Sequence, residues 1–135
     1  MPKQRQDLRQ RTRLFALAVI RLCSSLPRRT DAQVLGTQLL RAGTSVGAHY
    51  HEAQRAKSTA DFVSKIEGAL QELEETLYWL QLVDEAKVAP SERLRPLASE
   101  ADELIAVMVS IAKSAKRRAK MSSSHLHPSA LIPHP

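Results

Sequence analysis

Carboxylates are the first residues of this chain to consider for chemistry, because several of them fall close together between positions 67 and 75. Helical di-iron proteins hold their metal with Glu-x-x-His pairs that project inward from two helices. No acidic residue of this chain has a histidine three positions after it. We therefore expect no metal site and no cofactor. The clustered carboxylates are Glu67, Glu72, Glu74 and Glu75.

The histidines and the single cysteine do not indicate a catalytic centre either. His49 and His51 are two positions apart, so on a helix they point about 200° away from each other and cannot share a metal ion. The sequence has no glycine-rich phosphate loop, no G-x-S-x-G motif and no Cys/His pairing. Cys23 lies among apolar residues, which favours a buried structural thiol over a nucleophile. We expect a protein that is not an enzyme.

Basic side chains carry a stronger functional signal. The 135 residues have a net charge of +6, but this charge is unevenly distributed along the chain. Residues 1–60 contain 11 basic and 3 acidic side chains, residues 61–103 contain 4 and 11, and residues 104–135 contain 5 and none. If the fold brings the two basic segments together, they form a surface that attracts anions.

Apolar residues recur at helical spacing in four segments, which must position these charges. Thr30 to Gln33 and Ser58 to Asp61 fit helix N-caps before the second and third segments. No segment alternates with a period of two. The chain is therefore predicted to be all-α, an antiparallel up-down-up-down four-helix bundle. The four segments cover residues 8–26, 30–53, 58–80 and 91–115.

Two boundaries near the C-terminus need separate treatment. Pro96 either kinks the first turn of the last helix or marks its true start, so that helix begins at Ser91 or at Pro96. After Lys120 the sequence MSSSHLHPSALIPHP contains three prolines, four serines and no periodicity. We predict one bundle domain over residues 1–120 and a flexible tail over residues 121–135.

Three of the four glycines fall within the second predicted helix. Gly36, Gly43 and Gly47, with Leu40 among them, are spaced so that they share one helical face. Each glycine inside a helix costs ~1 kcal/mol relative to alanine. A close helix–helix approach, a subunit contact or a ligand near the backbone would offset this cost. The remaining alternative is that the Gly43–Ser45 stretch divides the helix in two.

The block RAGTSVGAHYHEAQRAKSTADFVSKIEGALQELEETLYWLQLV resembles the signature of a four-helix-bundle family, first noted as products of intervening sequences in bacterial 23S ribosomal RNA genes. Family members often carry Asn where this chain has His49. The resemblance implies a ring-shaped homopentamer. It extends distantly to the accessory variability determinant protein of diversity-generating retroelements, which acts with a reverse transcriptase and nucleic acid. The signature positions, assigned to packing and assembly, are Arg41, Gly43, Thr44, Ser45, Gly47, Tyr50, Glu52, Asp61, Phe62, Lys65, Glu75, Tyr78 and Trp79.

The charged and aromatic residues of this signature are expected to hold the helices together. Arg41, Lys65 and the nearby carboxylates Glu72 and Glu75 are expected in or near the bundle, where opposite charges bridge the second and third helices. The Tyr78-Trp79 pair either packs at a helix or subunit seam or stacks on nucleobases, and we favour the seam.

The predicted topology gathers the basic residues in space. In an up-down-up-down bundle, the start of the first helix, the link between the second and third helices and the end of the fourth lie at one end. A concentrated basic surface binds phosphate backbones by counterion release, without sequence preference. We expect weak, non-specific binding of RNA or DNA. The residues expected to bind are Arg5, Arg9, Arg11, Arg13, Arg55, Lys57, Lys113, Lys116, Arg117, Arg118 and Lys120.

The alternative function is a structural or protein-interaction module, whose ring recruits a protein partner and whose basic residues only aid solubility. No membrane partner is expected, because no apolar run approaches the ~20 residues that span a bilayer. A lone cysteine cannot form an internal disulfide, which favours a reducing compartment. We therefore expect a cytoplasmic homo-oligomer.

Overall fold

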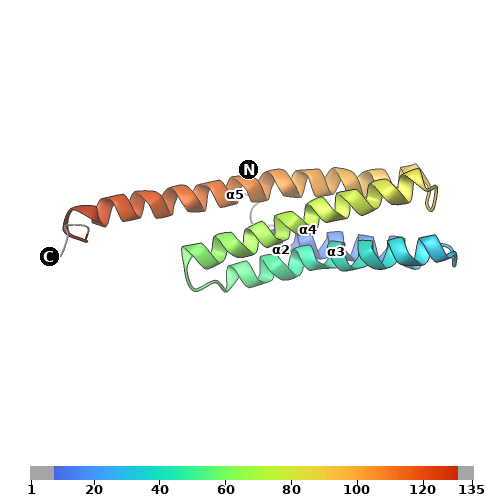
Figure 1. The fold of residues 1–135 in the computed structure, drawn as a ribbon, viewed down its shortest axis with the longest axis horizontal. Coiled ribbons are helices and arrows are strands. Elements are labelled where there is room, and N and C mark those ends of the chain that lie inside the picture. The colour runs from blue at the N-terminus through green and yellow to red at the C-terminus, as the bar shows by residue number, and fades with distance from the viewer. Residues whose placement is uncertain (1–7, 131–135) are drawn as a thin grey trace.

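Four helices make up an elongated antiparallel bundle in the computed structural model, which describes the backbone of residues 8–130 and the side chains of residues 8–122 (Figure 1). No strand occurs in this part of the chain. Helix α3 packs most extensively against α4 and α2, α5 packs mainly on α4, and contact between α2 and α5 is sparse. The predicted all-α, four-helix architecture is confirmed. The helices are α2 (Leu8–Ser24), α3 (Thr30–Gln54), α4 (Thr59–Glu85) and α5 (Ser91–Ala130).

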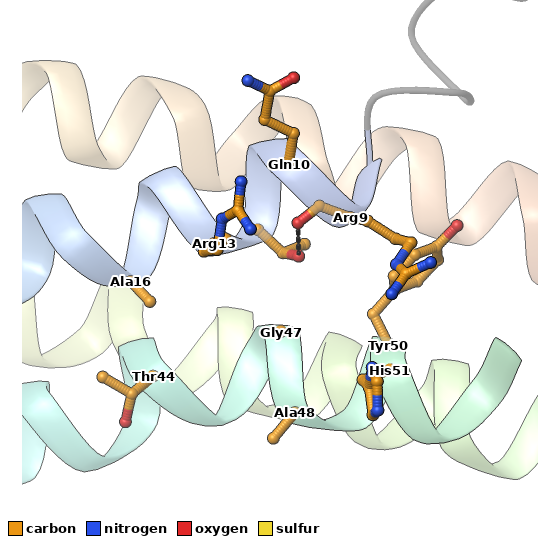
Figure 2. A pocket seen from close by; sticks show the side chains of 10 residues that line it. Arg9, Gln10, Arg13, Ala16, Thr44, Gly47, Ala48, Tyr50 and His51 are labelled. Carbon is orange, nitrogen blue, oxygen red and sulfur yellow. Dashed lines mark hydrogen bonds between the residues drawn. The ribbon is translucent and has the colours of Figure 1, made fainter. Parts of the chain in front are cut away.

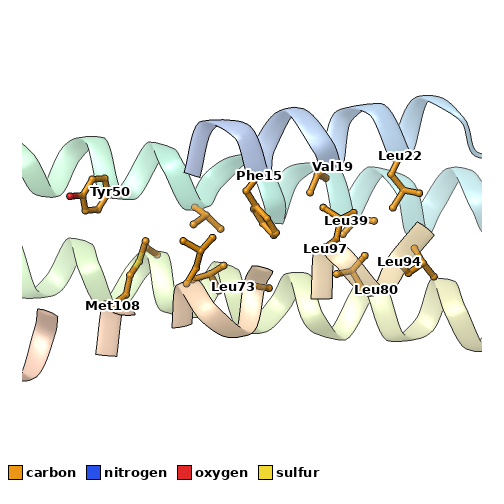
Figure 3. Packing of buried hydrophobic residues seen from close by; sticks show 14 of the residues in the cluster. Phe15, Val19, Leu22, Leu39, Tyr50, Leu73, Leu80, Leu94, Leu97 and Met108 are labelled. Carbon is orange, nitrogen blue, oxygen red and sulfur yellow. The ribbon is translucent and has the colours of Figure 1, made fainter. Parts of the chain in front are cut away.

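The core is built mainly from aliphatic side chains on one face of each helix (Figure 3). Leu39, Leu73 and Met108 are completely buried, and Phe15 of α2 is nearly so. Burial of such a side chain stabilises the fold by about 1.5–3 kcal/mol. The outward faces are largely polar, and none of the helices, as far as they are described, has a stretch long and apolar enough to cross a membrane.

Two glycines of α3 face α2, and a third faces the link that follows α2. A Cβ atom on Gly43 would stand 2.8 Å from Cγ2 of Val19, and one on Gly36 would stand 2.9 Å from Cδ1 of Leu26. A Cβ atom on Gly47 would lie 3.3 Å from Oγ1 of Thr12. The helix runs unbroken through all three positions. Close helix packing therefore offsets the helix-weakening effect of these glycines.

The N-cap predictions have different outcomes. Ser58 caps α4 as predicted, because its hydroxyl accepts a hydrogen bond from the backbone N–H of Asp61 at 3.0 Å. The predicted Thr30 capping box is wrong: the N-cap residue of α3 is Arg29, and no side chain caps it. The carboxylate of Asp31 accepts from the N–H of Ala32 at 2.8 Å instead. The Asp31 carboxylate in the first turn thus accepts a backbone hydrogen bond, the role that was predicted for the Thr30 hydroxyl.

Helix α5 begins at the earlier of the two predicted starts and is longer than its apolar pattern. It starts at Ser91, so Pro96 lies in its second turn. Pro96 is exposed, and the carbonyl that lacks its N–H partner can bind water there. The helix continues past Lys120 to Ala130, through a stretch that has no Gly or Pro before Pro128. The flexibility of residues 121–135 stays a prediction, and residues 131–135 lie outside the described part.

Candidate nucleic-acid interface

The basic segments gather toward one end of the bundle, though not all at its tip. Helix α2 begins part-way along the bundle, short of the end that α3 and α4 reach (Figure 1). Helix α5 passes the start of α4 there, where Lys116 and Ala119 line a hollow together with Thr59. We define the basic tip by its exposed cations. These are Arg55, Lys57, Lys113, Arg117, Arg118 and Lys120.

Arg11 does not belong to this surface. Its guanidinium donates to both carboxylate oxygens of Glu100, at 3.0 and 2.7 Å, and to Glu103 at 3.2 Å. The hydrogen bond to Glu100 raises the pKa of Arg11, partly opposed by burial. Arg11 therefore ties α2 to α5 through carboxylates that balance its charge, and its role in binding stays a prediction.

Two further predicted residues need comment. Lys116 donates to Glu67 at 2.9 Å, but both side chains are more than half exposed. Water weakens such a pair, so Lys116 stays accessible to an anion. Arg5 lies outside the described residues.

The other arginines of α2 border a groove between α2 and α3 (Figure 2). We call it the α2–α3 groove, and its volume is about 650 Å³. Arg9 and Arg13 stand one turn apart on the α2 wall, and both are exposed. The groove brings together two predicted basic residues with signature residues of α3. Its lining consists of Arg9, Gln10, Thr12, Arg13, Ala16, Thr44, Gly47, Ala48, Tyr50 and His51.

Small residues leave room for this groove. Gly47 has no side chain on α3, and Ala16, which lies toward Thr44, has only a methyl group on α2 (Figure 2). Thr12 is buried, and its hydroxyl donates to the carbonyl of Leu8 at 2.8 Å. The hydroxyl of Thr12 is thus already hydrogen-bonded, and the arginine side chains of the lining are those of Arg9 and Arg13.

Tyr50 borders one end of the α2–α3 groove, and its hydroxyl points past Arg9, away from the groove (Figure 2). Its ring is only 9% exposed, and Nε2 of Gln54 donates to its hydroxyl oxygen at 3.5 Å. Burial raises the pKa of Tyr50, while the charge of Arg9 and the hydrogen bond from Gln54 lower it by less. The phenol is therefore neutral at pH 7 and can donate its proton to an anion.

The same tyrosine also borders the basic tip. A smaller hollow of about 160 Å³ is lined by Tyr50 together with Ile111, Ser114 and Arg118 of α5. Tyr50 therefore borders both hollows, one lined by Arg9 and the other by Arg118.

The polar signature residues lie elsewhere, along the seam between α3 and α4. Arg41 forms an ion pair with Glu75 and lies 3.5 Å from Glu72, and the indole N–H of Trp79 donates to Glu75 at 3.3 Å. Further along the seam, Lys65 lies 3.6 Å from Glu52. These pairs bridge the two helices as the sequence predicts. They are partly exposed, so they set the register of the helices more than they add stability.

His49 lies between two carboxylates of the same seam. Its Nε2 is 3.7 Å from Glu72, and its Nδ1 is 3.9 Å from Glu52. The ring packs on Gly68, where a Cβ atom would stand 2.8 Å from Nδ1. Within the described residues, no three His, Cys, Asp or Glu side chains are grouped as a metal ion requires.

The remaining signature residues have local roles. The hydroxyls of Thr44 and Ser45 donate to carbonyls of their own helix at 2.7 Å. Phe62 is partly buried against the core. Tyr78 is 54% exposed and meets Trp79 edge to face, with ring centroids 5.0 Å apart. Neither ring lines the α2–α3 groove, so the aromatic pair lies apart from Arg9 and Arg13.

Sequence reasoning missed the α2–α3 groove and five of its members. A signal was present, because the groove residues repeat at i, i+3, i+4 and i+7 on both helices. Recognising it required knowing which turn of α2 faces which turn of α3. The missed residues are Gln10, Thr12, Ala16, Ala48 and His51.

Comparison with known proteins gives one family and one solved fold. The sequence model of the family described as "23S rRNA-intervening sequence protein" matches residues 4–110. A crystal structure of a protein with unknown function from the S23 ribosomal protein family of Bacteroides thetaiotaomicron is 33% identical. The match covers 78% of this chain and 97% of that one, with a TM-score of 0.74. No curated protein matches this chain.

Proposed function

The chain belongs to the 23S rRNA-intervening sequence protein family, and from this premise we propose that it is a non-enzymatic, self-associating protein that binds RNA or DNA weakly and without sequence specificity. The binding surface is the α2–α3 groove together with the basic tip. The structural relative is described as a protein of unknown function, so this assignment depends on the surface of the present chain.

The observation that carries the proposal is the concentration of free cations on this surface. Arg9 and Arg13 line the groove that Tyr50 borders, Arg118 lines the smaller hollow beside it, and the link at Arg55 and Lys57 adds further charge. Within residues 8–122, no acidic side chain forms an ion pair with any of these five cations. By contrast, Arg11, Arg29 and Arg41 are held by carboxylates.

Free cations of this kind bind phosphates by releasing counterions. Each phosphate neutralised on a single strand contributes about −0.7 to the slope of log K against log salt. The exposed arginine side chains are long and are not held in one orientation by a partner. They can therefore contact phosphates but do not select particular bases. Binding is therefore expected at low salt and weak near physiological salt.

Self-association is supported by apolar side chains that the single chain leaves exposed. Leu14 is 51% exposed, and Ile20 and Leu40 are each about two-fifths exposed. Ile20 and Leu40 line one hollow of about 200 Å³ at the far stretch of the α2–α3 seam. Exposed apolar patches mark protein–protein contacts. We propose that copies meet here, and the family resemblance implies a pentameric ring that would repeat the basic surface.

Filter binding tests the nucleic-acid proposal. The full chain should retain labelled RNA and DNA of arbitrary sequence at low salt and release them as salt rises. Absence of retention at low salt would overturn the proposal. The protein-interaction alternative predicts two results together. The chain would retain no nucleic acid on the filter, and a protein partner pulled down from lysate would stay bound after nuclease treatment.

A further inference from the structure

The two walls of the α2–α3 groove are matched along their length. On α2 the lining residues include Arg9, Arg13 and Ala16, and on α3 they include Thr44 and His51. The helices are antiparallel, so Arg9 lies toward His51 and Ala16 lies toward Thr44 (Figure 2). The groove is thus a channel parallel to the helices, with its cations at successive turns of one wall.

The charge of the groove is one-sided. Arg9 and Arg13 supply two guanidinium groups from α2. On α3, the hydroxyl of Thr44 already donates to the carbonyl of Leu40 at 2.7 Å, and Ala48 is apolar. A strand in this channel would place its phosphates along α2 and its sugars and bases along the α3 wall. The hydroxyl of Tyr50 lies beyond Arg9 (Figure 2), where it would donate to a phosphate of the strand as it leaves the groove.

The width of the groove decides which form of nucleic acid enters it. Packed helix axes lie about 8–10 Å apart, so the mouth of a groove between them is narrower than a duplex. A duplex would rest across the rim and reach only the ends of the arginine side chains. A single extended strand can lie inside, where a volume of about 650 Å³ is enclosed on two sides.

We propose that the α2–α3 groove is a binding site for an unpaired RNA or DNA strand, whose phosphates contact Arg9 and Arg13. This inference rests on the nucleic-acid binding proposed above and adds a preference for single strands. The contacts are to phosphates, so single-stranded RNA and single-stranded DNA bind alike. Duplex binding is left to the exposed cations of the basic tip.

Fluorescence anisotropy of the full chain at low salt tests this inference with three probes of equal length: single-stranded RNA, single-stranded DNA and double-stranded RNA. Ala16→Leu places a larger side chain in the groove from the α2 wall without changing charge (Figure 2), and should weaken single-strand binding roughly tenfold. Duplex affinity should not change. Ala106→Leu, at an exposed alanine of α5, should change neither affinity.

Tyr50→Phe is a second variant that keeps the buried ring and removes only the hydroxyl. It should weaken single-strand binding about threefold or more without lowering the melting temperature by more than a few degrees. Equal affinity for single strands and duplex, with no effect of either variant, would overturn the groove site and leave the proposed function intact. Absence of binding to all three probes would overturn the proposed function itself.

Discussion

Gly43 of α3 and Val19 of α2 are packed so closely that a Cβ atom on Gly43 would stand 2.8 and 2.9 Å from the two methyl carbons of Val19. Valine is branched at Cβ and its χ1 angle is stiff, so these methyl groups cannot rotate away. The contact fixes how near α2 comes to α3, and it therefore sets the depth of the α2–α3 groove that begins one turn further along.

This contact predicts the effect of Gly43→Ala. Alanine favours the helix by ~1 kcal/mol, but the forced shift of Val19 costs about 1–3 kcal/mol, so stability should fall. Gly47→Ala is the matched control: its new Cβ atom would meet Thr12 at 3.3 Å, and the helix gain should cancel the strain. Urea unfolding at one protein concentration measures both. Equal stabilisation by the two variants would show that the seam is loose.

Arg11→Ala should separate structural from binding arginines. Loss of the bonds to Glu100 and Glu103 leaves a partly buried carboxylate without a partner, and should cost about 1–2 kcal/mol of stability. Affinity for nucleic acid should stay unchanged once the variant is folded. Arg9→Ala should show the reverse pattern, with unchanged melting temperature and weaker binding. If Arg11→Ala weakened binding as much as Arg9→Ala, the ion pair would not be holding Arg11 in solution.

Self-association should depend on the exposed apolar residues of the α2–α3 seam. The double variant Ile20→Glu/Leu40→Glu places charge in the hollow that both residues line, and should lower the solution mass to that of a monomer. Val34→Glu alters an equally apolar, more exposed residue that does not line this hollow, and should leave the mass unchanged. Light scattering measures each mass. A monomeric wild-type chain would refute assembly through this surface.

Cys23 should react slowly in the folded protein. Burial raises the pKa of its thiol from 9.0 to about 11, and its Sγ lies 3.4 Å from the carbonyl of Gly36. At pH 8 the reactive thiolate should be roughly a hundredfold scarcer than in the unfolded chain. The folded state holds this proton more tightly, so the stability it adds is complete below pH 9 and is lost as pH rises through about 11. Alkylation rates with and without denaturant check this, and equal rates would contradict burial.

The bundle itself could be predicted from sequence because helical periodicity records which face of each helix is buried. The Ser58 cap was also predictable, since its partner lies three positions away. Arg11 was not, because its partner Glu100 lies on another helix and depends on the register of α2 against α5. The register of α2 against α3, a separate one, decides that Arg9 lies near Tyr50. Periodicity shows which face of a helix is buried, but it does not show which turns of two helices lie side by side. It therefore could not distinguish arginines that form ion pairs from arginines that do not.

The continuation of α5 beyond its apolar pattern could not be predicted from composition. Serine and histidine are only mildly unfavourable in helices, and neither glycine nor proline interrupts the chain between Lys113 and His127. A polar, aperiodic segment can therefore continue a helix that is already formed, as α5 does to Ala130.

The central claim is that free cations of the α2–α3 groove bind phosphates, and the salt dependence of binding tests it most directly. The affinity for single-stranded RNA should be measured over a salt series for the wild type, for Arg9→Ala/Arg13→Ala and for Arg21→Ala/Arg28→Ala. The last variant removes the same charge from exposed residues toward the other end. The groove variant should flatten the slope of log K against log salt by about 1.4, and the control should leave it unchanged. Equal slopes for all three proteins, or no binding at low salt, would contradict the claim.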